Sequence, residues 1–275
     1  NTRETDEQGR CALGDGFFKG VFPKNNGRDF FALEGRPLEI WKKHYGDKIV
    51  DFGAGKLNNT RTLRQAGLFV SAFEPYFVGA GDKVYKAKSI EIAKKFLDEV
   101  ESGVEYTSVF ISSVFNSVPF MEDRIKIAII AAALCKPRGK VVCWCQSNET
   151  NQFVLTKKRH AGDEKGLTFD LDYEPNIVLG DLRQHPKVQK GHTEDELKKI
   201  FGKSFKRIDR LEKISKFWYL EASHPVVSLE SLAEALDFEF ELPYPDGTTL
   251  GLSRKAREAF EKRLGVHLPE RKSNE

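Results

Sequence analysis

The stretch Val50-Asp-Phe-Gly-Ala-Gly-Lys-Leu-Asn-Asn-Thr60 ends a short run of strand-forming residues on two glycines and leads into a helical segment. A glycine at the end of a buried strand lets the backbone turn sharply, and a second glycine two positions later lets a ligand approach without meeting a β-carbon. The helix that follows directs its unpaired N–H groups toward whatever lies in the turn. The stretch therefore predicts a ligand-binding turn between a strand and a helix.

An acidic residue ends the next predicted strand, at residues 68–74. A carboxylate at this place, here Glu74, can accept hydrogen bonds from both hydroxyls of a ribose. Ligands of open α/β sheets bind beyond the carboxyl ends of the strands. We therefore expect Gly53, Gly55 and Glu74 to meet at one site.

Strand and helix patterns alternate around this turn. Buried strands are predicted at 48–52, 68–74, 106–113 and 140–145, and helices at 37–45, 60–66, 89–100 and 122–135. A helix begins at the capping box of Thr193 and Glu196, and two antiparallel strands follow at 205–211 and 216–222. The alternation predicts an α/β three-layer sandwich with a mostly parallel sheet and helices on both faces.

Nicotinamide dinucleotides are one class of cofactor whose binding sites use glycines and an acid in this arrangement, so an NAD-linked protein is one interpretation of it. The dinucleotide fingerprint G-x-G-x-x-G has Asn58 at its third glycine, which is the residue that allows close helix–strand packing beside a pyrophosphate. Asp51, before the first glycine, would repel a pyrophosphate and suits a ligand with a positively charged amino group. An NAD-linked oxidoreductase is therefore the weaker interpretation.

The segment Asp51-Phe-Gly-Ala-Gly resembles motif I of the class I S-adenosylmethionine-dependent methyltransferases, and Phe73-Glu74-Pro75 resembles their motif II. Residues 108–119 resemble the fourth strand of that family with its following loop. The run that starts at Lys187 resembles the helix before the paired last strands. The resemblance runs in order through most of the chain from 45 to 222.

This resemblance implies methyl transfer from S-adenosylmethionine, on a seven-stranded sheet whose last strand is antiparallel. The cofactor-binding residues that it implies are Asp51, Gly53, Ala54, Gly55, Glu74, Ser112 and Ser113. In that family pattern Asp51 would face the amino group of the cofactor, and Glu74 would hold its ribose. The glycines would line its methionine portion, and the two serines would form the floor of the pocket near the methyl group.

Two positions depart from the family pattern. Leu57 stands where the third glycine is usual, and Thr107 replaces an acid that often opens the fourth strand. They leave a second interpretation open, in which a degenerate methyltransferase-like domain serves as a binding or scaffold module in a larger assembly. Residues 1–30 and 224–275 would then be the surfaces for a partner protein.

The acceptor of the methyl group is not identified by these motifs. Asn116 follows the fourth predicted strand, but the sequence Asn-Ser-Val-Pro lacks the paired prolines of amino-methylating enzymes. The basic residues Lys157, Lys158 and Arg159 lie in a predicted insertion at about 147–192, and further lysines follow between 187 and 207. They form either a solvated face, which is the slightly favoured interpretation, or a surface that contacts phosphates. Among possible acceptors, nucleic acid is slightly favoured. We treat Asn116, Lys157, Lys158 and Arg159 as candidate substrate-binding residues.

No catalytic residue and no metal site stand out. His185 and His192 are candidate bases, although such histidines more often lie on the surface. Cys143 and Cys145 point to one face of a buried strand, which is typical of core residues rather than of a thiolate nucleophile or metal ligands.

The composition is that of a folded chain. Of 275 residues, 40% are hydrophobic and 31% charged, which excludes a disordered protein, and 44 basic against 41 acidic residues give a net charge of only +3. The longest apolar run is nine residues, whereas a membrane-spanning helix needs about 20. The first ten residues are polar, unlike a signal peptide. We expect a cytoplasmic protein with an arm at 1–30, a methyltransferase-like domain at 31–223 and a C-terminal helical extension at 224–275.

Overall fold

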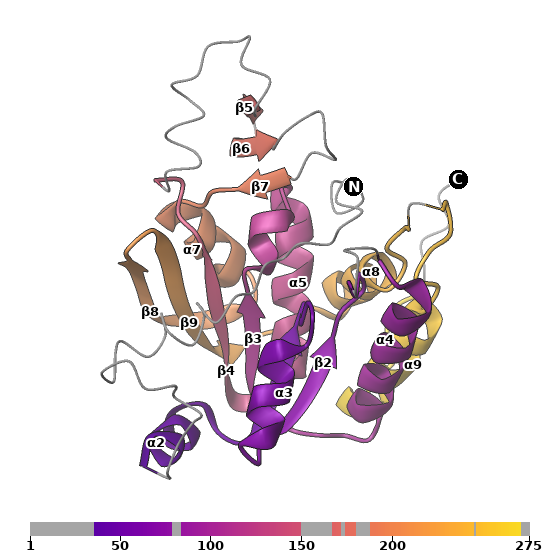
Figure 1. The fold of residues 1–275 in the computed structure, drawn as a ribbon. Coiled ribbons are helices and arrows are strands. Elements are labelled where there is room, and N and C mark those ends of the chain that lie inside the picture. The colour runs from indigo at the N-terminus through magenta and orange to yellow at the C-terminus, as the bar shows by residue number, and fades with distance from the viewer. Residues whose placement is uncertain are drawn as a thin grey trace.

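The computed structural model describes residues 36–78, 84–149, 167–171, 174–179, 188–244 and 246–270. Its main feature is a six-stranded sheet of β1 to β4 with β8 and β9 (Figure 1). Across the sheet the order is β2 (Phe69–Phe73), β1 (Lys48–Phe52), β3 (Tyr106–Ser112), β4 (Cys135–Gln146), β9 (Phe217–Pro225) and β8 (Phe205–Ile214). The first four strands are parallel, and β9 runs antiparallel to both β4 and β8. The predicted mostly parallel sheet with an antiparallel last strand is confirmed.

The predicted number of strands, seven, is wrong for the described residues, which contain six in this sheet. Only residues 74–85 separate β2 from the next helix, α4 (Lys86–Glu101), and this stretch is too short for a further helix and strand. Its described part contains an isolated bridge between Val78 and Val84. β2 is therefore an edge strand, and the Arg64 guanidinium donates two hydrogen bonds to the carbonyl oxygen of Val70 in it, at 3.0 and 2.6 Å.

Helices cover both faces of the sheet, which confirms the three-layer sandwich. Side chains alternate between the two faces of a strand, so neighbours such as Ile49 and Val50 enter different cores. On the face of Ile49 lie α2 (Arg36–Tyr45) and α3 (Asn58–Gln65). On the face of Val50 lie α4, α5 (Met121–Leu134) and α7 (Glu194–Gly202).

Most element boundaries lie close to their predicted places. The capping box is present, because the Thr193 hydroxyl accepts from the Glu196 amide at 3.2 Å while the Glu196 carboxylate accepts from the Thr193 amide at 2.8 Å. The clearest difference is β4, which begins at Cys135 rather than Lys140 and passes through Gly139. A β-carbon on Gly139 would lie 3.0 Å from the carbonyl oxygens of Lys136 and Tyr106, so the strand can continue here because the residue is glycine.

The predicted insertion contains a second, three-stranded antiparallel sheet. It consists of β5 (Leu167–Leu171), β6 (Glu174–Leu179) and β7 (Val188–Lys190). The predicted arm at 1–30 lies outside the described residues. A short 3-10 helix, η3 (Val114–Ser117), follows β3 and contacts β7.

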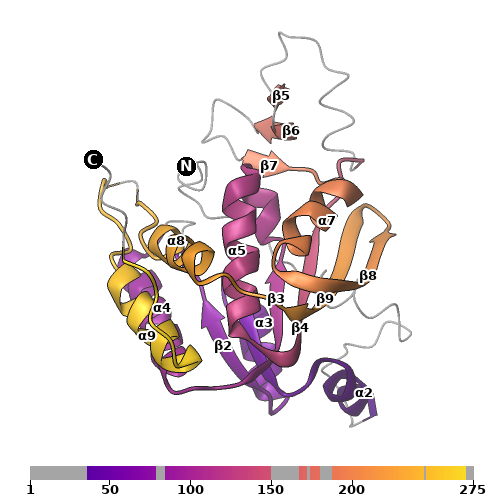
Figure 2. The ribbon, with the colours of Figure 1, turned by 180° about the vertical axis from the view of Figure 1, so that it is seen from behind.

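The C-terminal helices pack on the same face as α4 and α5, as Figure 2 shows from behind. They are α8 (Leu229–Glu239) and α9 (Ser253–Leu264). Leu236, Phe240 and Phe260 are fully buried in the core that also contains Phe73 and Phe96. In the part of the chain that the structure describes, no helix is long and apolar enough to cross a membrane.

Candidate functional site

The glycine turn lies at the carboxyl end of β1 and is tied to the end of β2. Gly53 and Gly55 both have positive φ, of 75° and 53°. The amides of Gly53 and Ala54 donate to the carbonyl oxygen of Phe73 at 2.8 and 3.0 Å. These bonds hold the turn beside the residue that precedes Glu74.

The turn also passes close to the segment that follows β3. A β-carbon on Gly53 would lie 2.3 Å from Cγ2 of Val114, where no side chain fits. Gly53 is therefore required by the packing of the turn itself, whether or not a ligand binds. The same contact brings the ends of β1 and β3 together, and this is the point where the strand order reverses direction.

Glu74 is buried at the end of β2, and its carboxylate is held by two backbone amides. Oε2 accepts from the amide of Gly55 at 2.5 Å, and Oε1 accepts from the amide of Tyr76 at 2.8 Å. Only 7% of the residue is exposed. The carboxylate therefore spans from the glycine turn to its own loop and has one fixed orientation.

Asp51 is also buried, on the face that α3 covers. Its Oδ2 accepts from the hydroxyl of Thr60 at 2.6 Å. Burial raises the pKa of Asp51 to about 6, although the bonds from Thr60 oppose this shift. One oxygen of Asp51 is thus directed to α3, rather than to the open side of the turn.

The two predicted serines lie after the middle of the sheet. Ser112 is the last residue of β3, and its buried Oγ has no hydrogen-bond partner in the part of the chain that the structure describes. Ser113 adopts a left-handed conformation, with φ 59°, and its amide donates to the carbonyl oxygen of Trp144 at 2.7 Å. Ser112 therefore presents a buried polar atom at the floor of the region between the ends of β1, β3 and β4.

Among the candidate substrate residues, only Asn116 lies in the described part of the chain. Its Oδ1 accepts from the amide of Gln146 at 2.8 Å, so its side chain joins η3 to the end of β4. Lys157, Lys158 and Arg159 lie outside the described residues. The structure thus gathers the turn, Glu74, Ser112 and Asn116 at the carboxyl ends of adjacent parallel strands, the usual place for a ligand in this class of fold.

His192 and the two core cysteines do not have the properties of catalytic groups. The interpretation of His192 as a surface residue is wrong, because it is fully buried, and His185 lies outside the described residues. Burial lowers the pKa of His192 well below its ordinary value, and the cations Arg124 and Lys190 lower it further. Cys143 and Cys145 are fully buried, as expected of core residues, and burial raises the pKa of the Cys143 thiol.

Several of the basic residues near α7 are paired with acids. The pairs are Lys190 with Glu196, Lys198 with Glu194, and Arg207 with Asp209. The first of these pairs is buried, and the other two lie on the surface. The ion pairs reduce the net positive charge that this region could offer to phosphates.

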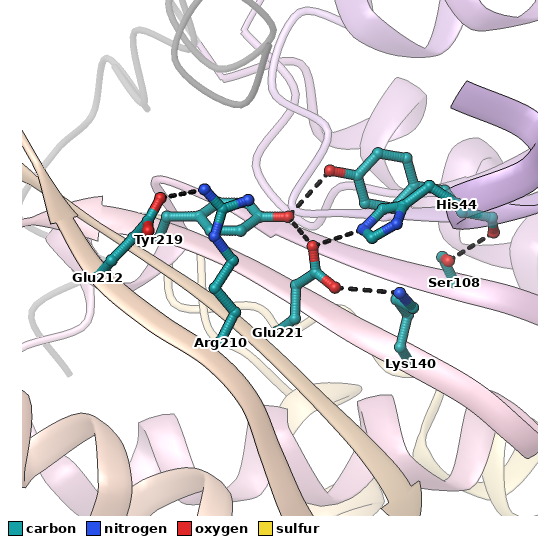
Figure 3. A network of polar contacts seen from close by, with 8 residues as sticks. His44, Ser108, Lys140, Arg210, Glu212, Tyr219 and Glu221 are labelled. Carbon is teal, nitrogen blue, oxygen red and sulfur yellow. Dashed lines mark hydrogen bonds and ion pairs between the residues drawn. The ribbon is translucent and has the colours of Figure 1, made fainter. Parts of the chain in front are cut away.

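A second polar cluster, which the sequence did not predict, lies on the α2 face of the sheet (Figure 3). The buried carboxylate of Glu221 contacts His44 Nε2 at 2.7 Å and Lys140 Nζ at 3.0 Å, and it accepts from the hydroxyl of Tyr219. The hydroxyl of Tyr45 lies 2.9 Å from that of Tyr219. The cluster joins α2 to β4 and β9, and strands β1 and β3 separate it from β2.

The sequence reasoning also missed two contacts of the C-terminal segment with the candidate site. The hydroxyl of Tyr244 donates to the carbonyl oxygen of Pro75 at 3.1 Å, and the hydroxyl of Tyr76 donates to that of Pro243 at 2.9 Å. No local pattern in the sequence predicts these contacts, because the partners are more than 160 residues apart.

No family model matches the chain, and no curated protein matches it. Solved structures do match it, at low identity. A SAM-dependent methyltransferase from Methanosarcina mazei is 15% identical, with 71% of this chain and 100% of that chain covered and a TM-score of 0.44. An S-adenosylmethionine-dependent methyltransferase from Clostridium acetobutylicum is 12% identical, with 76% and 98% covered and a TM-score of 0.43. The 1,6-didemethyltoxoflavin-N1-methyltransferase of Burkholderia thailandensis is 14% identical, with 78% and 86% covered and a TM-score of 0.40.

Proposed function

We propose that this chain, which has the class I methyltransferase fold, transfers a methyl group from S-adenosylmethionine to an acceptor. The observation that carries the proposal is the setting of Glu74. Its carboxylate lies at the end of the strand next to β1, and the amides of Gly55 and Tyr76 fix its orientation. A buried acid held in this way beside a glycine turn supports recognition of a ribose.

The residues present fit such a cofactor. Glu74 would accept from the ribose hydroxyls, and the backbone from Gly53 to Gly55 would line the methionine portion. The buried Ser112 hydroxyl, which has no hydrogen-bond partner among the described residues, would gain one from the ligand. Asp51 would act mainly by its negative charge and by holding Thr60 at the start of α3. When bound, the cofactor supplies an electrophilic methyl group on a sulfonium.

The contribution of the protein to the reaction would be positioning. Holding an acceptor atom in line with the methyl group replaces an encounter in solution, and this effect supplies much of the catalysis in such sites. His192 is a poor base, because burial and two neighbouring cations disfavour its protonated form. We therefore propose that His192 does not accept the proton that an amine or hydroxyl acceptor releases on methylation.

Two groups of basic residues bear on the chemical class of the acceptor. Lys157, Lys158 and Arg159 support nucleic acid, whereas the ion pairs of Lys190, Lys198 and Arg207 reduce the charge available to it. Nucleic acids and small amines or hydroxyl compounds therefore both belong in the acceptor screen. Leu57 favours the scaffold alternative only weakly, because its backbone already has the left-handed conformation that a glycine would take.

Titration calorimetry with S-adenosylmethionine and S-adenosylhomocysteine tests the proposal on wild type, Glu74→Ala and Glu91→Ala. Glu91 is an exposed helix residue paired with Lys88, so its variant is a matched control for loss of a carboxylate. We expect wild type and Glu91→Ala to bind alike and Glu74→Ala to bind at least about tenfold more weakly, because hydrogen bonds to a charged group are lost. Absence of wild-type binding at millimolar ligand would leave only the scaffold function.

A further inference from the structure

The C-terminal segment packs against the end of β2 in the hydrophobic core. Phe240, the residue that follows α8, is fully buried, and its ring lies 4.9 Å from that of Phe73, centroid to centroid. Phe73 immediately precedes Glu74, and its carbonyl oxygen accepts the amides of Gly53 and Ala54. The packing of the C-terminal segment therefore reaches the backbone on which both parts of the candidate site depend.

The segment after Phe240 forms hydrogen bonds with the loop that follows Glu74. We name residues 241–250 the C-terminal turn; all of them except residue 245 are described. The Tyr244 hydroxyl donates to the carbonyl oxygen of Pro75, and the Tyr76 hydroxyl donates to the carbonyl oxygen of Pro243. The rings of Tyr76 and Tyr244 meet edge to face, with centroids 5.8 Å apart. Two reciprocal bonds thus join the turn to Pro75 and Tyr76.

The C-terminal turn is itself held in place, so it can act as a fixed support. The Tyr244 amide donates to the carbonyl oxygen of Thr248 at 2.7 Å, and the Leu250 amide to that of Leu242 at 2.9 Å. Lys86, the first residue of α4, contacts Asp246 at 3.2 Å and lies 5.6 Å from the centre of the Tyr244 ring. The turn is therefore anchored on both sides of the loop between β2 and α4.

We propose that the C-terminal turn forms part of the S-adenosylmethionine site. In this proposal Tyr244 is a positioning residue: it fixes the orientation of the Glu74 carboxylate through the backbone of Pro75 and Tyr76. The inference rests on the proposed function and extends it to a segment outside the family pattern. The Tyr76 amide binds one carboxylate oxygen of Glu74, so the orientation of that carboxylate follows the position of this loop. The C-terminal turn thus stabilises the loop after β2, which is the edge strand of the sheet.

The protonation state of Tyr244 is the one that a hydrogen-bond donor to Pro75 needs. Burial raises the pKa of its hydroxyl to about 12; a hydrogen bond with Ser89 opposes this shift, and the nearby charges of Glu74 and Asp246 add to it. The hydroxyl is therefore protonated at neutral pH and able to donate to Pro75. Its effect on a ligand would be confined to the adenosine half, because Glu74 is the group that it positions.

The test is calorimetry with two probes, S-adenosylhomocysteine and 5′-methylthioadenosine, the second of which lacks the amino-acid part. The variants are Tyr244→Phe and the control Tyr45→Phe, which removes a buried hydroxyl bonded to Tyr219 of β9, a strand that β1, β3 and β4 separate from β2. Thermal unfolding of each variant, with and without ligand, reports the loss of stability separately. Hydrogen exchange of the Gly55 and Tyr76 amides reports the fixation of Glu74 directly.

We expect Tyr244→Phe to weaken both probes by the same factor, about three- to tenfold for one lost hydrogen bond, and to speed exchange of both amides. Tyr45→Phe should bind as wild type does, even if its unfolding temperature falls as far. Unchanged affinity of Tyr244→Phe overturns the inference and leaves the proposed function intact, and so does an equal loss in Tyr45→Phe. Failure of wild type to bind either probe removes both.

Discussion

The backbone at Leu57 explains how the turn is formed without its third glycine. Leu57 has φ 59° and ψ 23°, in the left-handed region, and its amide donates to the carbonyl oxygen of Ala54 at 2.9 Å. A residue with a β-carbon is strained in this conformation, whereas glycine is not. The departure from the family pattern therefore changes the energy of the turn and not its shape.

This strain predicts the effect of substitutions at Leu57. We expect Leu57→Gly to be more stable than Leu57→Ala by about 1 kcal/mol, because both lose the side chain but only alanine keeps the β-carbon. Urea unfolding of the two variants measures the difference, with wild type as reference. Equal stability would show that the left-handed backbone at this position is not costly.

The buried Asp51 carboxylate lowers the stability of the folded chain at neutral pH, so its replacement should stabilise the chain in a pH-dependent way. Its pKa is about 6 in the folded chain against an ordinary 3.8, because burial disfavours the charged carboxylate. The folded chain thus binds more protons than the unfolded chain between these values, and stability falls as the pH rises through that window. Asp51→Asn, which can still accept from Thr60, removes this penalty.

We therefore expect Asp51→Asn to be more stable than wild type at pH 7.5, by up to roughly 3 kcal/mol. The gain should shrink as the pH falls and approach zero only near pH 3, where the carboxyl is largely neutral in both the folded and the unfolded chain. Unfolding at the two pH values measures it, and Asp47→Asn, at an exposed residue, is the control. A variant less stable than wild type at pH 7.5 would show that the charge of Asp51 is stabilised in the fold.

At the residue scale the sequence predicts the candidate site better where roles depend on backbone than where they depend on side chains. The glycines and Glu74 come together as expected, because strand ends and a turn determine their positions. The direction of Asp51 toward Thr60 and the bond of Asn116 to Gln146 were not predictable, since each depends on packing between elements. Tyr244 was missed for the same reason.

Among the elements, α2 is attached to the sheet by the polar cluster of Figure 3. Burial alone would raise the pKa of Glu221, but hydrogen bonds from His44 and Tyr219 and the contact with Lys140 lower it to about 2. Its ordinary value is 4.5. The charged carboxylate therefore contributes stability above about pH 4.5, and this contribution is lost as the pH falls toward 2.

Glu221→Gln tests the contribution of this cluster. At pH 7 we expect a loss of roughly 2 to 3 kcal/mol, since charged partners remain beside a neutral amide. The difference from wild type should become smaller at pH 3, where Glu221 begins to be protonated. Urea unfolding at both pH values provides the measurement. A loss of the same size at pH 3 would indicate a packing effect of the amide instead of a lost charge.

At this scale, strands buried on both faces were the most predictable elements. The runs that became β1 and β3 consist largely of β-branched and aromatic residues, and their predicted ranges match the structure closely. The seventh strand was predicted from family resemblance alone, and the short link between β2 and α4 leaves no room for it. The early start of β4 was not predicted, because Pro137 and Gly139 are typical of the connection that follows a helix.

For the molecule as a whole, the C-terminal helices share one core with the sheet. Leu236 and Phe260 belong to the same buried cluster as Val50 and Ile111. The guanidinium of Arg263 in α9 donates to the carbonyl oxygens of Ala133, at 3.3 Å, and Leu134, at 2.5 Å. These are the last residues of α5, so α9 satisfies carbonyl groups that the helix end leaves unpaired.

This shared core makes a prediction about the boundary placed at residue 223. A chain that ends there would expose the buried faces of α4 and α5, which α8 and α9 cover, and would leave the carbonyl groups at the end of α5 without Arg263. Exposed apolar surface of this kind weakens the main driving force of folding. We expect residues 1–223 to show no cooperative thermal transition by circular dichroism and to bind a dye for exposed apolar surface. A cooperative transition close to that of the full chain would instead establish residues 224–275 as a separate appendage, and the support of Glu74 by the C-terminal turn would then need another origin.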